Sequence, residues 1–100
     1  MIEKTTVMFK TNEYFDGKVK SIAFEDNEGP ATIGVMAKGE YEFSTSDKEF
    51  MTVTSGKMTV LLPDANEWKV YNQFETFIVE KNNSFKVKLD DQAAYLCLYR

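Results

Sequence analysis

The stretch GVMAKGEYEFSTSDKEFMTVTSG, from Gly34 to Gly56, holds the pattern that decides the fold of this chain. Glu40 and Glu42 stand two residues apart in it, and Glu49 comes seven residues before the last glycine. Short apolar segments alternate here with turn residues, as they do in paired β-strands. The stretch therefore predicts a β-hairpin that presents three carboxylates at fixed positions.

Strand-length segments and turn signals continue outward to both ends of the chain. Asp16-Gly17 is typical of a tight hairpin and lies in an expected turn at 12–17. Ser55-Gly56 is typical of a hairpin that joins 49–54 to 57–62. The segment DNEGP at 26–30 predicts a turn or loop. No segment has a convincing helical period. The predicted strands cover residues 4–9, 18–24, 31–37, 40–44, 49–54, 57–62, 68–71, 76–79, 84–89 and 94–99. An all-β chain of this kind forms a sandwich, a jelly roll or a small barrel.

Composition indicates one folded domain over residues 1–100, with 1–10 expected as a loose or edge segment. The apolar share of 43% and the aromatic share of 14% are those of a globular protein, not of a disordered chain. Cys97 has no partner within the chain, and no segment resembles a signal peptide or a membrane helix. The net charge of −4 and the scattered lysines argue against nucleic-acid binding. We expect a cytoplasmic protein that contacts neither membrane nor nucleic acid.

The spacing from Gly34 to Gly56 resembles the first motif of the cupin superfamily. That motif is a glycine followed after five residues by His-x-His, then a Glu, then six residues and a second glycine. Here Glu40 and Glu42 take the histidine positions, and Glu49 keeps the spacing to the second glycine. The resemblance implies a cupin-type jelly-roll barrel. The chain has no histidine, and carboxylates alone suit only metals such as Mg²⁺, Ca²⁺ or Mn²⁺, so we expect no metal and no cofactor.

Longer blocks resemble one family of small single-domain bacterial cupins, the pyrimidine/purine nucleoside phosphorylases, formerly an uncharacterised family. The blocks are NEYFDGKVKSI at 12–22, GEYEFST at 39–45, EFMTVTSG and LLPDANEW within 49–68, and YLCLY at 95–99. The chain departs from the family pattern at 74–81, which lacks a Pro-Gly turn, and at Leu98, where some relatives have an arginine.

The resemblance implies a pentosyltransferase of broad specificity. Inorganic phosphate, as co-substrate, would attack the anomeric carbon of a purine or pyrimidine nucleoside and release the free base and a pentose 1-phosphate. A homodimer is also expected, since small cupins commonly pair through edge strands, which must be covered or paired.

A phosphorylase needs groups that bind phosphate and sugar hydroxyls and that stabilise positive charge at the anomeric carbon. The resemblance implies catalytic roles for Glu40 and Glu49, at ligand positions that point into a cupin barrel. The substrate-binding candidates are Lys38, Tyr41, Glu42, Ser44, Thr45 and Tyr95, with Lys18 and Lys20 as further phosphate candidates. Alternation gives another interpretation, in which Tyr41 and Phe43 fill the core and Glu40 faces solvent with Glu42.

Several aromatic residues are candidates for stacking on a base, because every base has a π-face. They are Tyr14, Phe15, Tyr41, Trp68, Tyr95 and Tyr99, and all of them equally suit a core or a dimer interface.

Cys97 shares a strand face with Tyr95 and Tyr99 and is expected as a small buried hydrophobe. Without histidine, a Cys/His nucleophile is excluded. A non-catalytic ligand-binding cupin and a structural dimer stay open as other functions.

Overall fold

The computed structural model of the protein describes residues 8–100, and its regular structure there is ten β-strands. The strands are β1 (Lys10–Tyr14), β2 (Val19–Asp26), β3 (Gly29–Met36), β4 (Gly39–Ser44), β5 (Glu49–Ser55), β6 (Met58–Leu61), β7 (Lys69–Tyr71), β8 (Thr76–Val79), β9 (Ser84–Leu89) and β10 (Ala93–Tyr99). All strand pairs are antiparallel. The all-β prediction is confirmed, and in residues 8–100 no helix is long and apolar enough to cross a membrane.

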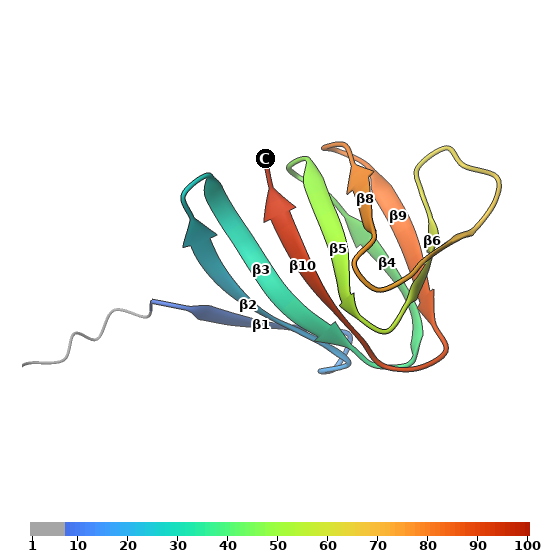
Figure 1. Cartoon of the computed structure of the whole chain (residues 1–100), viewed down its shortest axis with the longest axis horizontal. Coiled ribbons are helices and arrows are strands. Elements are labelled where there is room, and N and C mark those ends of the chain that lie inside the picture. Colours follow the sequence, from blue (N-terminus) through green and yellow to red (C-terminus); the bar gives the residue numbers. More distant parts are fainter. Residues whose placement is uncertain (1–7) are drawn as a thin grey trace, which may run out of the picture.

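The strands form two sheets that pack face to face in one domain (Figure 1). The larger sheet has the order β1-β2-β3-β10-β5-β8, and the smaller has the order β4-β9-β6-β7. Side chains alternate between the two faces of a strand, so every second residue of β9, namely Phe85, Val87 and Leu89, is buried. The core thus lies between the sheets, where β9 meets inward residues of the larger sheet such as Val53 and Cys97.

The strands that were expected to form a hairpin around Glu40 belong to different sheets. β3 pairs with β2 and β10, whereas β4 pairs with β9, so the chain crosses from one sheet to the other at 37–38. Glu40 and Glu42 therefore lie on the smaller sheet, and Glu49 lies on the larger one. The prediction of one hairpin carrying all three carboxylates is wrong.

The turn at Ser55-Gly56 also joins the two sheets instead of two paired strands. β5 pairs with β10 and β8, and β6 pairs with β7 and β9. Gly56 has a φ of 78°, and a Cβ there would lie 2.9 Å from the carbonyl oxygen of Gln92, so only glycine fits the crossing. The hairpin predicted here is wrong because a short turn signal specifies a reversal of the chain, not the partner of each strand.

Two predicted turns near the start of the chain do connect paired strands. β1 and β2 pair with Tyr14 opposite Val19, which confirms the hairpin signal at Asp16-Gly17. The turn is shorter than 12–17, because β1 continues to Tyr14. The predicted turn at 26–30 shrinks to two residues between β2 and β3. Most of the strand predicted at 4–9 lies outside the described residues, and β1 begins after it, at Lys10.

Candidate active site

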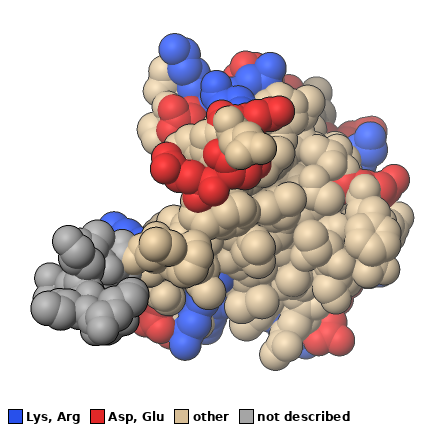
Figure 2. Space-filling view, turned by 60° about the vertical axis from the view of Figure 1, so that its left-hand side comes forward, with Lys and Arg blue, Asp and Glu red and all other residues tan. Residues whose placement is uncertain are grey.

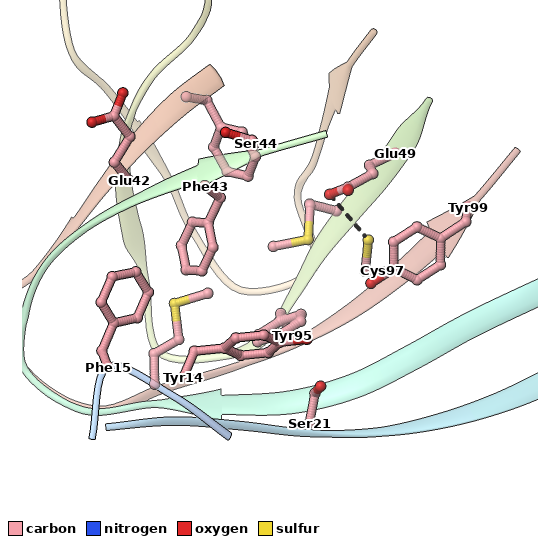
Figure 3. A pocket seen from close by; sticks show the side chains of 13 residues that line it. Tyr14, Phe15, Ser21, Glu42, Phe43, Ser44, Glu49, Tyr95, Cys97 and Tyr99 are labelled. Carbon is pink, nitrogen blue, oxygen red and sulfur yellow. Dashed lines mark hydrogen bonds between the residues drawn. The ribbon is translucent and has the colours of Figure 1, made fainter. Parts of the chain in front are cut away.

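A pocket of about 430 Å³ lies between the two sheets. The 13 residues that line it come from seven strands and from the turn between β1 and β2 (Figure 3). Its volume is within the range of roughly 300–1,000 Å³ that small-molecule sites occupy. The pocket has a polar end around Glu49 and an aromatic end around Phe15, and Figure 3 shows these ends on opposite sides of the cavity.

Glu49 is the carboxylate of the polar end. It begins β5, and β10 places Tyr99 directly opposite it. The Cys97 thiol donates a hydrogen bond to Glu49 Oε1 across 3.5 Å (Figure 3). Partial burial raises the pKa of the Glu49 carboxyl above its ordinary value, the Cys97 hydrogen bond lowers it, and the nearby Asp47 charge raises it further. A partly desolvated carboxylate in a cavity is a typical feature of functional sites.

Tyr99 also lines this end of the pocket, and Thr32 holds its hydroxyl from behind. The Tyr99 hydroxyl and Thr32 Oγ1 share a hydrogen bond of 3.0 Å, which joins β10 to β3. Burial raises the pKa values of the Tyr99 phenol and the Cys97 thiol well above their usual range, so both groups stay protonated at neutral pH. The sequence prediction of Cys97 as a buried residue is confirmed, but its contact with Glu49 was missed, because the two residues are far apart in the sequence.

Tyr95, one of the predicted substrate-binding residues, lines the floor of the pocket. It is buried on β10, and burial raises the pKa of its phenol to about 12. Its partner on β3 is Gly34, where an added Cβ would overlap the tyrosine ring. Gly34, the first residue of the stretch 34–56, thus leaves space for the Tyr95 ring to lie across the neighbouring strand.

Glu40 does not reach the pocket. It is exposed on β4 opposite Lys88, on the face of the smaller sheet that points away from the core. Tyr41, the next residue, is buried and donates a hydrogen bond of 2.7 Å to the carbonyl oxygen of Ala37. The structure therefore does not bring Glu40 and Glu49 into one cavity, and the alternation of core and solvent positions is the interpretation that holds on β4.

The remaining predicted residues divide between the rim of the pocket and the structure around it. Glu42 and Ser44 lie at the rim, and the Glu42 carboxylate points away from the cavity (Figure 3). Thr45 is buried; its hydroxyl donates to the Glu80 carbonyl oxygen across 2.7 Å and fixes the turn before β9. Lys38 is exposed between β3 and β4 and does not line the pocket.

The aromatic end contains residues that the sequence identified less clearly. Phe15 lies with its ring centroid 5.6 Å from that of Phe43 and 5.0 Å from that of Tyr41. Tyr14 and Phe85 also line this part of the pocket. Tyr14 and Phe15 were stacking candidates, Phe43 was expected only as a core residue under alternation, and Phe85 was not singled out.

Positive charge is absent from the pocket wall in the described part of the chain. None of the lining residues is Lys or Arg. Arg100 is held by Asp26, with its guanidinium 3.2 Å from the carboxylate, and by the carbonyl oxygen of Pro30 at 3.1 Å. Within residues 8–100, no group of three or more His, Cys, Asp or Glu residues gathers as a candidate metal site.

Two facing antiparallel sheets around a pocket are the architecture of the cupin-like proteins. An RmlC-like cupin from Shewanella frigidimarina has this fold, with a TM-score of 0.70 at 18% identity over 89% of this chain and 80% of that one. The predicted cupin-type fold is thereby confirmed.

Residues 9–99 match the family described as pyrimidine/purine nucleoside phosphorylase, and the chain belongs to that family. A "Pyrimidine/purine nucleoside phosphorylase" from Cellvibrio japonicus is 59% identical over 92 residues, which cover 92% of this chain and 99% of that protein. A Vibrio parahaemolyticus protein of unknown function superposes with a TM-score of 0.88 at 41% identity, over 91% of this chain and 97% of that one. The predicted activity class, a pentosyltransferase that acts on purine and pyrimidine nucleosides, is confirmed by this membership.

Proposed function

We propose that the pocket between the sheets binds the nucleoside and that Glu49 assists the reaction at its anomeric carbon. In phosphorolysis a phosphate oxygen forms a bond to C1′ while the C1′–N bond breaks. The bonding electron pair leaves with the base, whose nitrogen then takes up a proton from solvent. Because C1′ becomes positively charged between the two events, a carboxylate beside it stabilises the transition state.

The single observation that carries this assignment is the position of Glu49. It is the carboxylate that lies inside the cavity, half-buried and hydrogen-bonded by Cys97. Partial removal from water strengthens its interaction with a developing charge. Tyr99 and Tyr95 line the same pocket, and their hydroxyls are the groups proposed to hydrogen-bond the sugar.

The phosphate would be held by neutral donors in this pocket. Phosphate can bind to hydroxyl and backbone N–H groups where no cation is present, and Ser44 presents its hydroxyl at the rim. Tyr95 on the floor keeps its proposed substrate contact, whereas the role of Glu42 stays a prediction, because its carboxylate points away from the cavity. Roles for Glu40, Lys38, Tyr41 and Thr45 stay predictions, without a position in the pocket that supports them.

The test is phosphate-dependent release of base from uridine and adenosine. Wild-type protein should release base only when phosphate is present. Glu49→Gln should lower kcat by roughly 10²–10³-fold with a smaller change in KM, because the lost charge acts mainly in the transition state. The matched control is Glu25→Gln, an exposed glutamate on β2 outside the pocket, which should react at the wild-type rate.

Two outcomes contradict the proposal separately. Binding of uridine without any base release would support the non-catalytic alternative. A wild-type rate in a correctly folded Glu49→Gln protein would show that the reaction takes place away from this carboxylate.

We also propose that the protein is a homodimer, and that the outer face of the larger sheet is the contact. Antiparallel sheets usually expose a polar face to water, but here Ile22, Ile33 and Leu96 lie side by side on three neighbouring strands of the outer face. Val35 on β3 is also 54% exposed. On the face in Figure 2 the charged side chains gather at the margins and leave a broad area without them. A second copy of this chain would cover such a surface.

A cytoplasmic location stays part of the proposal. Its support is Cys97, which is buried as a free thiol, as is usual in a reducing compartment.

A further inference from the structure

We propose that the turn between β1 and β2, together with Phe43, forms the subsite that stacks on the base of the nucleoside. This inference rests on the proposed function of the pocket. It adds the orientation of the substrate, with the ribose at the Glu49 end and the base at the Phe15 end. It also gives a physical reason why one site accepts both purines and pyrimidines.

The backbone holds Phe15 in a conformation that bulky residues rarely adopt. Phe15 and Asp16 have φ values of 53° and 57°, in the left-handed region, and Gly17 follows at 84°. Two backbone hydrogen bonds close the turn, from Gly17 N to Tyr14 O at 3.2 Å and from Lys18 N to Phe15 O at 3.1 Å. A bulky residue in this region is strained, and such strain is often found at ligand sites.

Core packing explains only part of this position of the ring, because Phe15 packs against Tyr41 and Phe43 and still leaves much of its surface in water. Phe15 is 44% exposed and Tyr14 is 48% exposed, although both side chains line the pocket. Large aromatic side chains gain stability by leaving water, so two half-exposed rings at a cavity mouth are costly to the free protein. A ligand that covers them would recover this free energy.

Phe15 and Phe43 line a pocket of about 430 Å³, a volume that can hold a flat group against their rings. Phe43 meets Phe15 edge-on, with an interplanar angle of 90°. Phe43 in turn packs on Phe85 at a centroid distance of 5.5 Å, so one end of this aromatic wall is anchored in the core and the other lies at the pocket mouth. Figure 3 shows Phe15 and Phe43 facing the cavity, across from Glu49 and Tyr99.

The chemistry of this wall suits a base of either class. Stacking is tolerant of base identity, whereas amide side chains discriminate bases by hydrogen bonds to their edges. Of the described residues that line the pocket, none is Asn or Gln. Stacking on these π-faces therefore lets uracil and adenine occupy the same place.

The test compares Phe15→Ala and Phe15→Leu with wild-type protein, using uridine, adenosine and phosphate in steady-state kinetics. Loss of one base–aromatic stack should raise KM for uridine and for adenosine by a similar factor, about 5- to 100-fold. KM for phosphate should stay unchanged. Phe15→Leu keeps apolar bulk in the turn but has no π-face, so it covers the case in which Phe15→Ala folds poorly. Phe15→Trp should retain low KM values.

The matched control is Phe74→Ala. Phe74 is also a phenylalanine in the left-handed region, with a φ of 70° and 74% exposure, but it does not line the pocket. Its replacement should leave both nucleoside KM values unchanged. The inference is overturned if folded Phe15→Leu behaves like Phe74→Ala, or if KM rises for only one class of nucleoside. A wild-type protein that releases no base would instead refute the proposed function itself.

Discussion

At the scale of single residues, the environment of Glu49 separates it from the other acidic side chains of the decisive stretch. Glu40 lies opposite Lys88 on an exposed sheet face, whereas Glu49 enters the cavity beside the Cys97 thiol. Burial makes the ionised form of Glu49 less favourable, and the thiol hydrogen bond partly offsets this effect. Cys97 is therefore proposed as a positioning residue that helps to keep the carboxylate charged.

This role of Cys97 predicts a change in pH dependence. Cys97→Ala removes the hydrogen bond that lowers the pKa of Glu49, so that pKa should rise further. If catalysis requires ionised Glu49, the acid limb of the kcat/KM profile moves to higher pH, since that limb reports groups of the free enzyme. Titration of phosphate itself is common to all variants and cancels in the comparison.

Cys97→Ser is the control for this prediction, because a serine hydroxyl can still donate a hydrogen bond to the carboxylate. Its profile should stay close to that of wild-type protein. Superimposable profiles for Cys97→Ala and wild type would show that the thiol has no influence on the reacting carboxylate.

At the scale of elements, the sequence predicts strands well and their partners poorly. Alternation depends only on neighbouring residues. It correctly places Tyr41 on the inner face of β4 and Glu40 on its outer face. Pairing depends on the whole chain, so the turn signal at Ser55-Gly56 did not reveal that β5 and β6 belong to different sheets.

The candidate site depends on pairing and could be predicted only in part. Glu49 was identified from its spacing within the motif, but the register between β5 and β10, which brings Tyr99 opposite it, is a contact between distant segments. The sequence identified Tyr14 and Phe15 as stacking candidates, but not the pocket that they line. The strained conformation of Phe15 and its contact with Phe43 required the folded chain.

At the scale of the whole molecule, the two faces of the larger sheet have different roles in this account. The inner face carries the polar end of the pocket, and the outer face carries the apolar residues proposed to meet a second copy. Sedimentation at micromolar concentrations should give the mass of two chains for wild-type protein. Ile33→Glu should give the mass of one chain, because a charge buried at the centre of the contact is strongly unfavourable.

Val70→Glu provides the control for the dimer. Val70 on β7 is 45% exposed, close to the 54% of Ile33, but it belongs to the smaller sheet. Its replacement should leave the mass of two chains. A wild-type mass of one chain throughout the micromolar range would contradict the proposed dimer.

A crystal structure with uridine in the absence of phosphate, when the reaction cannot proceed, would show where the nucleoside lies. We predict that the ribose lies within hydrogen-bonding distance of Glu49 and that the uracil ring lies against Phe15. Uridine bound elsewhere, for example in the cavity of about 410 Å³ lined by Lys18 and Lys20, would contradict the account.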